Sequence, residues 1–265
     1  MGLRWTAKLL GCINGAVLLL CVGCAKPAPT PVDPAVYKKA VAAEVSRYYP
    51  VAMADLKPDF DAQGVSFPPK EVTLLVFKQE KEMELWAKGS GQDSWHWVKN
   101  YSVLAASGGP GPKLKNQDRQ VPEGVYQISV LNPHSLFHLS MELDYPNAFD
   151  RTYAAVDGRK NLGGEIFIHG SHYSIGCIAI GNQAIEDLFV LTSLTGMSNL
   201  RVIIAPNDLR YEAPIYSQAH PKWLPKLYAQ LQMALEPFGG VGYNSNVVMA
   251  EKAEARVKAE TAQKA

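Results

Sequence analysis

Short runs of apolar and β-branched residues, separated by turns, constrain the fold of this chain more than any other feature. Val72, Leu74 and Val76 recur with a period of two, which is typical of a β-strand beginning at residue 71. Further runs lie at residues 83–86, 97–105, 124–130, 137–143, 165–169 and 201–205. The last two are almost continuously apolar, as expected for strands buried on both faces of a sheet. The pattern predicts a mainly β fold with flanking helices (α+β).

Helix signals stand before and after these runs. Asp33 can cap a helix that begins at Pro34 and ends at Pro50. Asn182 can cap a second helix, which Gly196 would end. The predicted units are a helical segment (34–70), a β-rich domain (71–206), an extension (207–249) with a helix at about 222–235, and a flexible tail (250–265).

The N-terminus predicts export from the cytoplasm. Arg4 and Lys8 precede an uncharged apolar run that is too short for a comfortable membrane span, so residues 1–23 fit a signal peptide. With 26 Lys and Arg against 25 Asp and Glu, the chain offers no electrostatic case for nucleic acid as a partner.

The end of this signal resembles a bacterial lipobox. Cleavage before Cys24 would allow lipidation of that cysteine, and residues 24–33 would form a Pro-rich tether. Because Ala25 follows rather than Asp, we expect a periplasmic protein anchored by lipid at the outer membrane. Ordinary cleavage and an uncleaved anchor are the alternatives, with a soluble periplasmic or an inner-membrane location. Cleavage would leave Cys177 as the only free thiol.

The segment from His169 to Cys177 carries the chemistry. It starts at the end of a predicted buried strand, and a loop of seven residues separates the imidazole from the thiol. A nearby imidazole or helix N-terminus lowers the pKa of a cysteine and makes it a better nucleophile. The backbone N–H groups of Gly176 and Cys177 could receive the oxyanion of a tetrahedral intermediate. The pattern predicts a cysteine nucleophile with a histidine base, and no cofactor or metal.

Other interpretations of this segment have less support. A buried, inert Cys177 beside a structural His169 stays open. A zinc site of His169, His172 and Cys177 matches no common ligand spacing. A serine nucleophile elbow fails at His172, which stands where the first glycine is required, so Ser174 is predicted to be a supporting hydroxyl.

The glycine-rich segment at residues 107–113 does not read as a phosphate loop. Pro110 and Pro112 lack the N–H groups that such a loop uses, and no Ser or Thr follows Lys113. We predict a surface turn there.

His169-Gly170, followed by Ser174-Ile175-Gly176-Cys177, resembles the signature of the L,D-transpeptidase catalytic domain (YkuD-like), the cysteine enzymes that cross-link bacterial peptidoglycan. Upstream segments similar in order and spacing to the YafK-like branch are 111–113, 122–126, 137–140 and 145–147. The resemblance covers about residues 71–206. It implies a β-sandwich-like catalytic domain with a short helix beside the site.

The resemblance also implies roles for individual residues. Cys177 corresponds to the acyl-accepting nucleophile and His169 to the general base, and the carbonyl of Gly170 would orient the imidazole. The candidate substrate-binding residues are His138, His172 and Tyr173, with a structural His138 and a solvent-exposed His172 as alternatives.

The implied reaction is attack on a peptidoglycan stem peptide at the carbonyl of its third residue, meso-diaminopimelate, with release of D-Ala and acyl transfer to an amine in cell wall biogenesis. Ile175 and Ala179 stand where most members have His and Arg, and the loop is shorter, so the acceptor stays open. The YafK-like branch includes a hydrolase that cuts the diaminopimelate link to an outer-membrane lipoprotein. An amidase with such a partner is therefore the first alternative, and a non-catalytic peptidoglycan-binding lipoprotein is the second.

Overall fold

The computed structural model describes residues 33–217 and 219–239. The predicted signal peptide, Cys24, most of the tether and all residues after 239 lie outside the described residues. The strands are β1 Glu71–Phe77, β2 Glu82–Lys88, β3 His96–Ser102, β4 Ala105–Ala106, β5 Gly124–Asn132, β6 Ser140–Leu143, β7 Phe167–His169, β8 Ile178–Ala179 and β9 Leu200–Ala205. The helices are α1 Pro34–Ala62, α2 Ala148–Val156, α3 Asn182–Thr195 and α4 Leu224–Leu235, with 3₁₀ turns η1 Met197–Asn199 and η2 Glu236–Gly239.

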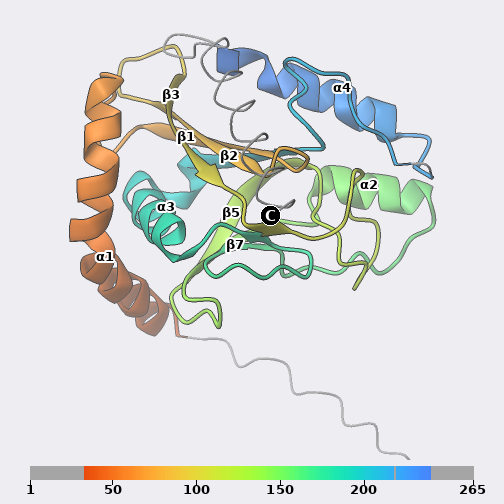
Figure 1. Ribbon diagram of the computed structural model, residues 1–265. Coiled ribbons are helices and arrows are strands. Elements are labelled where there is room, and N and C mark those ends of the chain that lie inside the picture. Colours follow the sequence, from red (N-terminus) through yellow and green to blue (C-terminus); the bar gives the residue numbers. More distant parts are fainter. Residues whose placement is uncertain (1–32, 218, 240–265) are drawn as a thin grey trace, which may run out of the picture.

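The nine strands form one curled sheet in the order β3-β2-β1-β9-β5-β6-β7-β8-β4 (Figure 1). β1 runs parallel to β9 and β7 runs parallel to β8, whereas the other neighbours are antiparallel. β5 pairs with β9 through its first half and with β6 through its second half, and its register shifts between Ile128 and Val130. Such a bulge bends a strand. The mainly β prediction is confirmed, and the predicted sandwich takes the form of a single sheet folded at β5.

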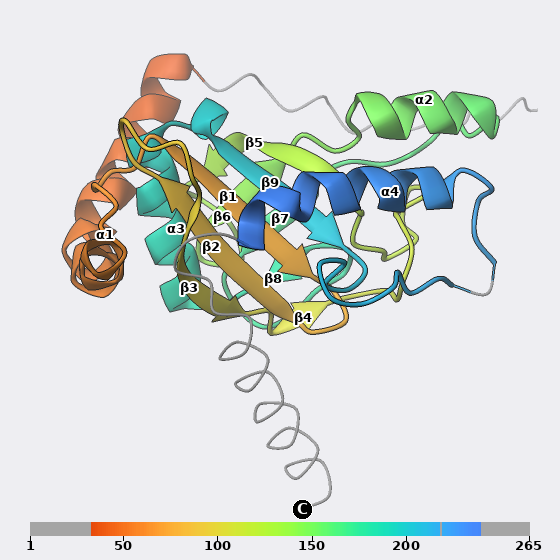
Figure 2. The same cartoon turned by 90° about the horizontal axis from the view of Figure 1, so that it is seen from above.

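The sheet buries apolar side chains on both faces. Leu74 and Val76 of β1 belong to a core shared with α1 and α3, while Leu75 and Phe77 belong to a second core under α4. Figure 2 shows α3 and α1 on one side of the strands and α4 across the other. Because both faces are covered, β1 carries apolar residues at nearly every position.

Helix α1 is longer than predicted. Its start is as expected, since Asp33 Oδ1 accepts a hydrogen bond of 2.8 Å from the N–H of Ala35. The prediction that Pro50 ends it is wrong, because the helix continues to Ala62. The second half buries Ala52, Leu56 and Phe60, and this packing outweighs the hydrogen bond that a proline removes. Figure 1 shows α1 bent along its length, as expected for a helix with internal prolines.

Two further predictions need correction. The run at 97–105 is not one strand: β3 ends at Ser102, and β4 pairs with β8 at the opposite edge of the sheet. Asn182 is the first residue of α3 and not its cap, which is Gly181 at φ +84°. The predicted stop of α3 at Gly196 is confirmed.

Helix α2 was not predicted from the sequence. A capping box starts it, in which the Asn147 and Asp150 side chains each accept a hydrogen bond from the other residue's backbone N–H. Within residues 33–217 and 219–239, no helix combines the length and apolar character needed to cross a bilayer.

Candidate active site

The parallel pair β7 and β8 brings the two ends of the predicted motif together. Ile168 lies opposite Ile178, and His169 lies opposite Ala179. His169 therefore ends one strand, and Cys177 immediately precedes the neighbouring strand. Antiparallel pairing with β6, where Ser140 lies opposite His169, fixes the other side of β7.

The imidazole of His169 is held in one orientation. Its Nδ1 lies 2.5 Å from the carbonyl oxygen of Gly170. A carbonyl only accepts hydrogen bonds, so Nδ1 carries the proton and Nε2 has a free lone pair in the neutral ring. The ring of Phe137 stacks on the imidazole with centroids 4.6 Å apart. Burial lowers the pKa of His169, although the hydrogen bond to Gly170 opposes this shift. The ring is therefore neutral at pH 7.

Gly170 has no room for a side chain. A Cβ at this position would lie 2.7 Å from both the carbonyl oxygen of Phe137 and Oδ1 of Asn182. The same Oδ1 accepts a hydrogen bond of 2.9 Å from the N–H of Ser171. Asn182, which was predicted to cap a helix, instead fixes the turn after the imidazole.

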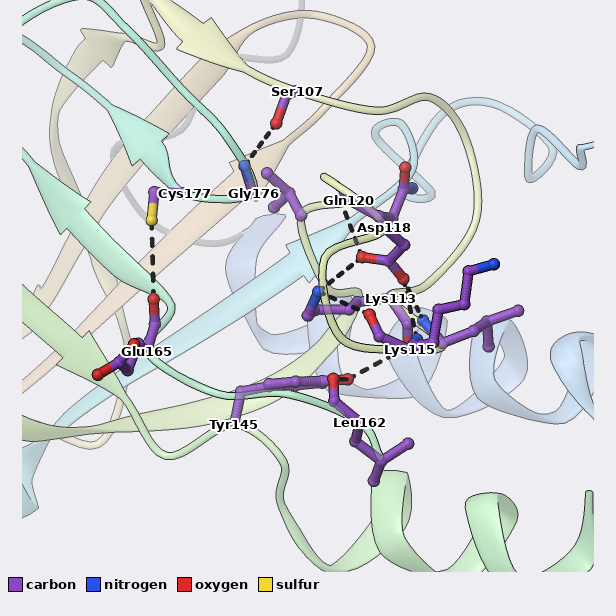
Figure 3. Close-up of polar contacts among 12 residues, drawn as sticks. Ser107, Lys113, Lys115, Asp118, Gln120, Tyr145, Leu162, Glu165, Gly176 and Cys177 are labelled. Atoms are coloured by element: carbon purple, nitrogen blue, oxygen red, sulfur yellow. Dashed lines mark hydrogen bonds and ion pairs between the residues drawn. The ribbon is translucent and has the colours of Figure 1, made fainter. Parts of the chain in front are cut away.

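Cys177 is half-buried, and its sulfur lies 3.9 Å from the carbonyl oxygen of Glu165 (Figure 3). Among the described residues, no hydrogen bond joins the sulfur to His169. Burial raises the pKa of the Cys177 thiol, and the Phe167 N–H and the Lys113 cation oppose this less strongly. The expected lowering of the thiol pKa is therefore wrong: α3 starts five positions later, and desolvation dominates. The site holds a neutral thiol next to the strand that bears a neutral imidazole.

The loop before Cys177 is tied to Ser107. Ser107 Oγ accepts a hydrogen bond of 2.5 Å from the N–H of Gly176 (Figure 3). The N–H of Gly176 is thus already engaged, which corrects its expected role as an oxyanion donor. Ser174 Oγ donates a hydrogen bond of 2.6 Å to the carbonyl of Cys177 and accepts one of 3.0 Å from the N–H of Ser107.

The glycine-rich segment lies at the surface, as predicted, only in its first half, where Gly108 and Gly109 are exposed. Gly111, Pro112 and Lys113 are buried. The Lys113 ammonium donates to Asp118 Oδ1 at 2.6 Å and lies near enough to Cys177 to act on its pKa (Figure 3). Reasoning from the sequence missed this lysine as well as Ser107, and the only signal for Lys113 was the similarity of residues 111–113 to the family pattern.

The three candidate substrate-binding residues do not share one environment. His138 lies in a turn at φ +77°, and its Nε2 is 2.6 Å from Glu186 of α3. Its ring also contacts Tyr48 of α1. These contacts with two helices fit the alternative prediction, in which His138 has a structural role. His172 and Tyr173 are exposed on the loop before Cys177, with ring centroids 4.1 Å apart. Across the described ranges, no three His, Cys, Asp or Glu side chains converge as a metal site would require.

The chain matches the family described as "L,D-transpeptidase catalytic domain" over residues 71–204. It is 31% identical over 160 residues to the Escherichia coli K12 protein named "Putative L,D-transpeptidase YafK", and the O157:H7 protein of that name matches equally. The aligned part is 57% of this chain and 62% of those proteins.

Solved structures with some likeness include the helical cell shape determining protein Pgp2 from Campylobacter jejuni, at 18% identity and a TM-score of 0.43 over 55% of this chain and 50% of that one. Bdellovibrio bacteriovorus Bd1075 matches at 18% identity and a TM-score of 0.38 over 65% of this chain and 57% of that one. The family match is the stronger finding, because it covers half of the chain, from β1 to β9, and includes both His169 and Cys177. The chain belongs to the L,D-transpeptidase catalytic domain family.

Proposed function

We propose that this chain is a periplasmic cysteine acyltransferase that acts on peptidoglycan stem peptides containing meso-diaminopimelate, with Cys177 as nucleophile and His169 as general base. The observation that carries the proposal is the 2.5 Å contact between His169 Nδ1 and the carbonyl of Gly170. That contact leaves Nε2 as the basic atom of a neutral imidazole. His169 ends β7, and Cys177 immediately precedes the neighbouring strand, β8. Family membership supports the same assignment.

In this mechanism Cys177 Sγ attacks the diaminopimelate carbonyl while its proton passes to His169 Nε2. The carbonyl oxygen becomes an oxyanion in the tetrahedral intermediate. Collapse of the intermediate breaks the C–N bond, and the leaving D-Ala nitrogen takes the proton from Nε2, so a thioester remains on Cys177. An acceptor amine then attacks the thioester, gives its proton to Nε2 and expels the sulfur, which recovers that proton.

The proton must move during the attack, because both groups start neutral. Burial raises the pKa of the Cys177 thiol and lowers the pKa of His169. The geometry therefore fits general-base catalysis better than a preformed thiolate and imidazolium pair. The sulfur moves from the carbonyl of Glu165, its partner in the free protein, towards the bound substrate.

Hydrolysis of the thioester is the second candidate. Tyr173 and Ile175 in the loop before Cys177 are 65% and 78% exposed, so water has access to the outer side of this loop. An amidase that releases peptide or protein from diaminopimelate would share every step up to the thioester. The two reactions differ only in whether water or an amine resolves it.

The test is mass spectrometry of peptidoglycan fragments incubated with the full chain in detergent, with Cys177→Ala as the matched control. New diaminopimelate cross-links or exchanged terminal D-amino acids would establish a transpeptidase. Loss of peptide or protein without a new bond would establish the amidase. Binding of peptidoglycan with identical fragments from wild type and Cys177→Ala would overturn both and leave a wall-binding lipoprotein.

The same proposal places the protein in the periplasm on a lipid at Cys24. Its support is the lipobox-like segment, which lies outside the described residues. Growth with a labelled fatty acid should label the wild-type chain and not Cys24→Ala, and the variant should leave the membrane fraction. Equal labelling of both would refute the anchor.

A further inference from the structure

Ser107 stands beside Cys177 because of the sheet register. β4 pairs antiparallel with β8, so that Ala105 lies opposite Ala179 and Ala106 opposite Ile178. Ser107 follows directly after this pairing, and it contacts Ser174 and Gly176 in the loop that ends at Cys177. Ser107 and Cys177 are separated by 70 positions in sequence, and strand pairing alone brings them together.

Ser107 makes three hydrogen-bond contacts with the loop that carries the nucleophile, one of them between its Oγ and Ser174 Oγ at 3.2 Å. Its Oγ accepts from the N–H of Gly176 at 2.5 Å, and its N–H donates to Ser174 Oγ at 3.0 Å. Ser174 in turn donates to the carbonyl of Cys177 at 2.6 Å. Ser107 therefore binds the peptide between Ile175 and Gly176 directly, and it reaches the carbonyl of Cys177 through Ser174.

This fixation matters because Gly176 adopts φ +106°, where glycine has wide conformational freedom. A peptide at such a position can rotate unless its N–H is bound. With the Gly176 N–H held by Ser107, the N–H of Cys177 has no hydrogen-bond partner within the described part of the chain. That N–H is free to receive the oxyanion that forms on the substrate carbonyl.

Ser107 is itself anchored to a buried ion pair. The carbonyl of Ser107 accepts a hydrogen bond of 3.2 Å from the N–H of Val121. The carbonyl of Val121 accepts one of 3.1 Å from Lys78 Nζ, which also lies 3.0 Å from Glu123 Oε1. The Lys78 and Glu123 side chains are only 6% and 0% exposed.

The anchor extends beyond the family match. Tyr228 of α4 donates a hydrogen bond of 2.9 Å to Glu123 Oε2, and the N–H of Gly111 donates to Glu123 Oε1 at 2.9 Å. Buried hydrogen bonds to Lys78 and Glu123 thus hold the loop from 107 to 123, and these two side chains are shielded from water.

We propose that Ser107 is a positioning residue for the nucleophile: it binds the N–H of Gly176 so that Cys177 presents its sulfur and its own N–H to one substrate carbonyl. The inference rests on the proposed function for its kinetic part only. The position of the thiol can be measured without a substrate.

The experiment compares the full chain with Ser107→Ala, Ser107→Thr and Ser198→Ala. Ser198 is an exposed serine in η1 and serves as the control. For Ser107→Ala we expect the rate constant of thioester formation to fall roughly 10- to 100-fold with KM nearly unchanged, because misplaced reacting groups lose rate rather than affinity. Ser107→Thr, which keeps the hydroxyl, should recover most of the rate.

The second readout is alkylation of Cys177 by iodoacetamide between pH 6 and pH 10, followed by peptide mass spectrometry. Release of the loop should expose the sulfur, bring its pKa back towards the usual value and accelerate alkylation at pH 7 in Ser107→Ala. Thermal unfolding of each variant checks that the fold is retained.

Three results would overturn the inference: unchanged alkylation in folded Ser107→Ala, a rise in KM with unchanged kcat, or no recovery in Ser107→Thr. If wild type neither transfers nor hydrolyses stem peptides but Ser107→Ala still alters alkylation, the proposed function fails and the positioning role stands.

Discussion

The carboxyl group of Asp187 should make the stability of this fold depend on pH. Asp187 lies on α3 without exposed surface, and its Oδ1 has no hydrogen-bond donor among the described residues. Tyr101 donates to Oδ2 at 3.5 Å, and the Asp55 carboxyl of α1 lies beside Asp187. A buried carboxylate in contact with a second, partly exposed carboxylate does not ionise readily, so we infer a shared proton. Burial, and then Asp55, raise the pKa of Asp187 to about 8.

The sign and size of the effect follow from this pKa. Above its usual pKa of 3.8 the unfolded chain has lost the proton, whereas the folded chain keeps it up to about pH 8. Rising pH therefore lowers the free energy of unfolding across that window. At ~1.4 kcal/mol for each pH unit, an isolated group would lose ~6 kcal/mol. The pKa of Asp55 is lowered, so its titration falls mainly below pH 4 and does not offset this loss; we expect a loss of ~3–6 kcal/mol between pH 4 and pH 8.

Other charged groups face the pair. Lys99 lies 2.9 Å from Asp55 and 3.0 Å from Asp59, and it opposes the rise in the pKa of Asp187. Glu186 adds to the rise. These contacts join α1 to α3 and β3, so the titration acts on the junction between the helical segment and the catalytic domain.

The perturbation is Asp187→Asn, which keeps the shape, offers N–H groups to Asp55 and never ionises. Urea unfolding followed by circular dichroism should show similar stabilities at pH 4 and a variant more stable by ~3–6 kcal/mol at pH 8. Asp61→Asn is the control, because Asp61 lies on α1, the helix of Asp55, in an exposed pair with Lys57, and its effect should stay within ~0.5 kcal/mol. Parallel pH curves for wild type and Asp187→Asn would refute the shared proton.

Three further predictions concern the site and its support. Gly170→Ala should reduce the rate of thioester formation by roughly 100-fold, because the new Cβ would lie 2.7 Å from the Phe137 backbone and from the Asn182 side chain. Gly239→Ala, where the Cβ would meet open space, should leave this rate unchanged. Equal rates for the two variants would contradict the steric argument. The value of kcat/KM should rise with pH as His169 loses its proton, with a midpoint below its usual 6.5; a midpoint above 6.5 would speak against His169 as the base. Lys78→Met should lower the free energy of unfolding by ~3–5 kcal/mol because Glu123 loses its buried cation. Adding Glu123→Gln should restore much of that loss, and denaturant unfolding that shows no recovery would exclude a charge-based cause.

The local patterns of the sequence settle a large part of the fold. The β-rich sequence of β1, the apolar run of β9 and the stop of α3 at Gly196 each depend on residues near one another in the chain. Conformational preference and burial pattern act over that short range, so they can be read before any tertiary contact is known. The motif from His169 to Cys177 was recognisable for the same reason.

Tertiary structure decided everything that depends on distant contacts or on desolvation. Packing of Leu56 and Phe60 carries α1 past Pro50, and no local rule states how strong that packing is. Ser107 reaches Gly176 across 69 positions, and only the pairing of β4 with β8 creates this contact. The direction of the Cys177 pKa shift also reversed, because a nearby imidazole can be read from sequence spacing whereas burial of the sulfur exists only in the folded chain.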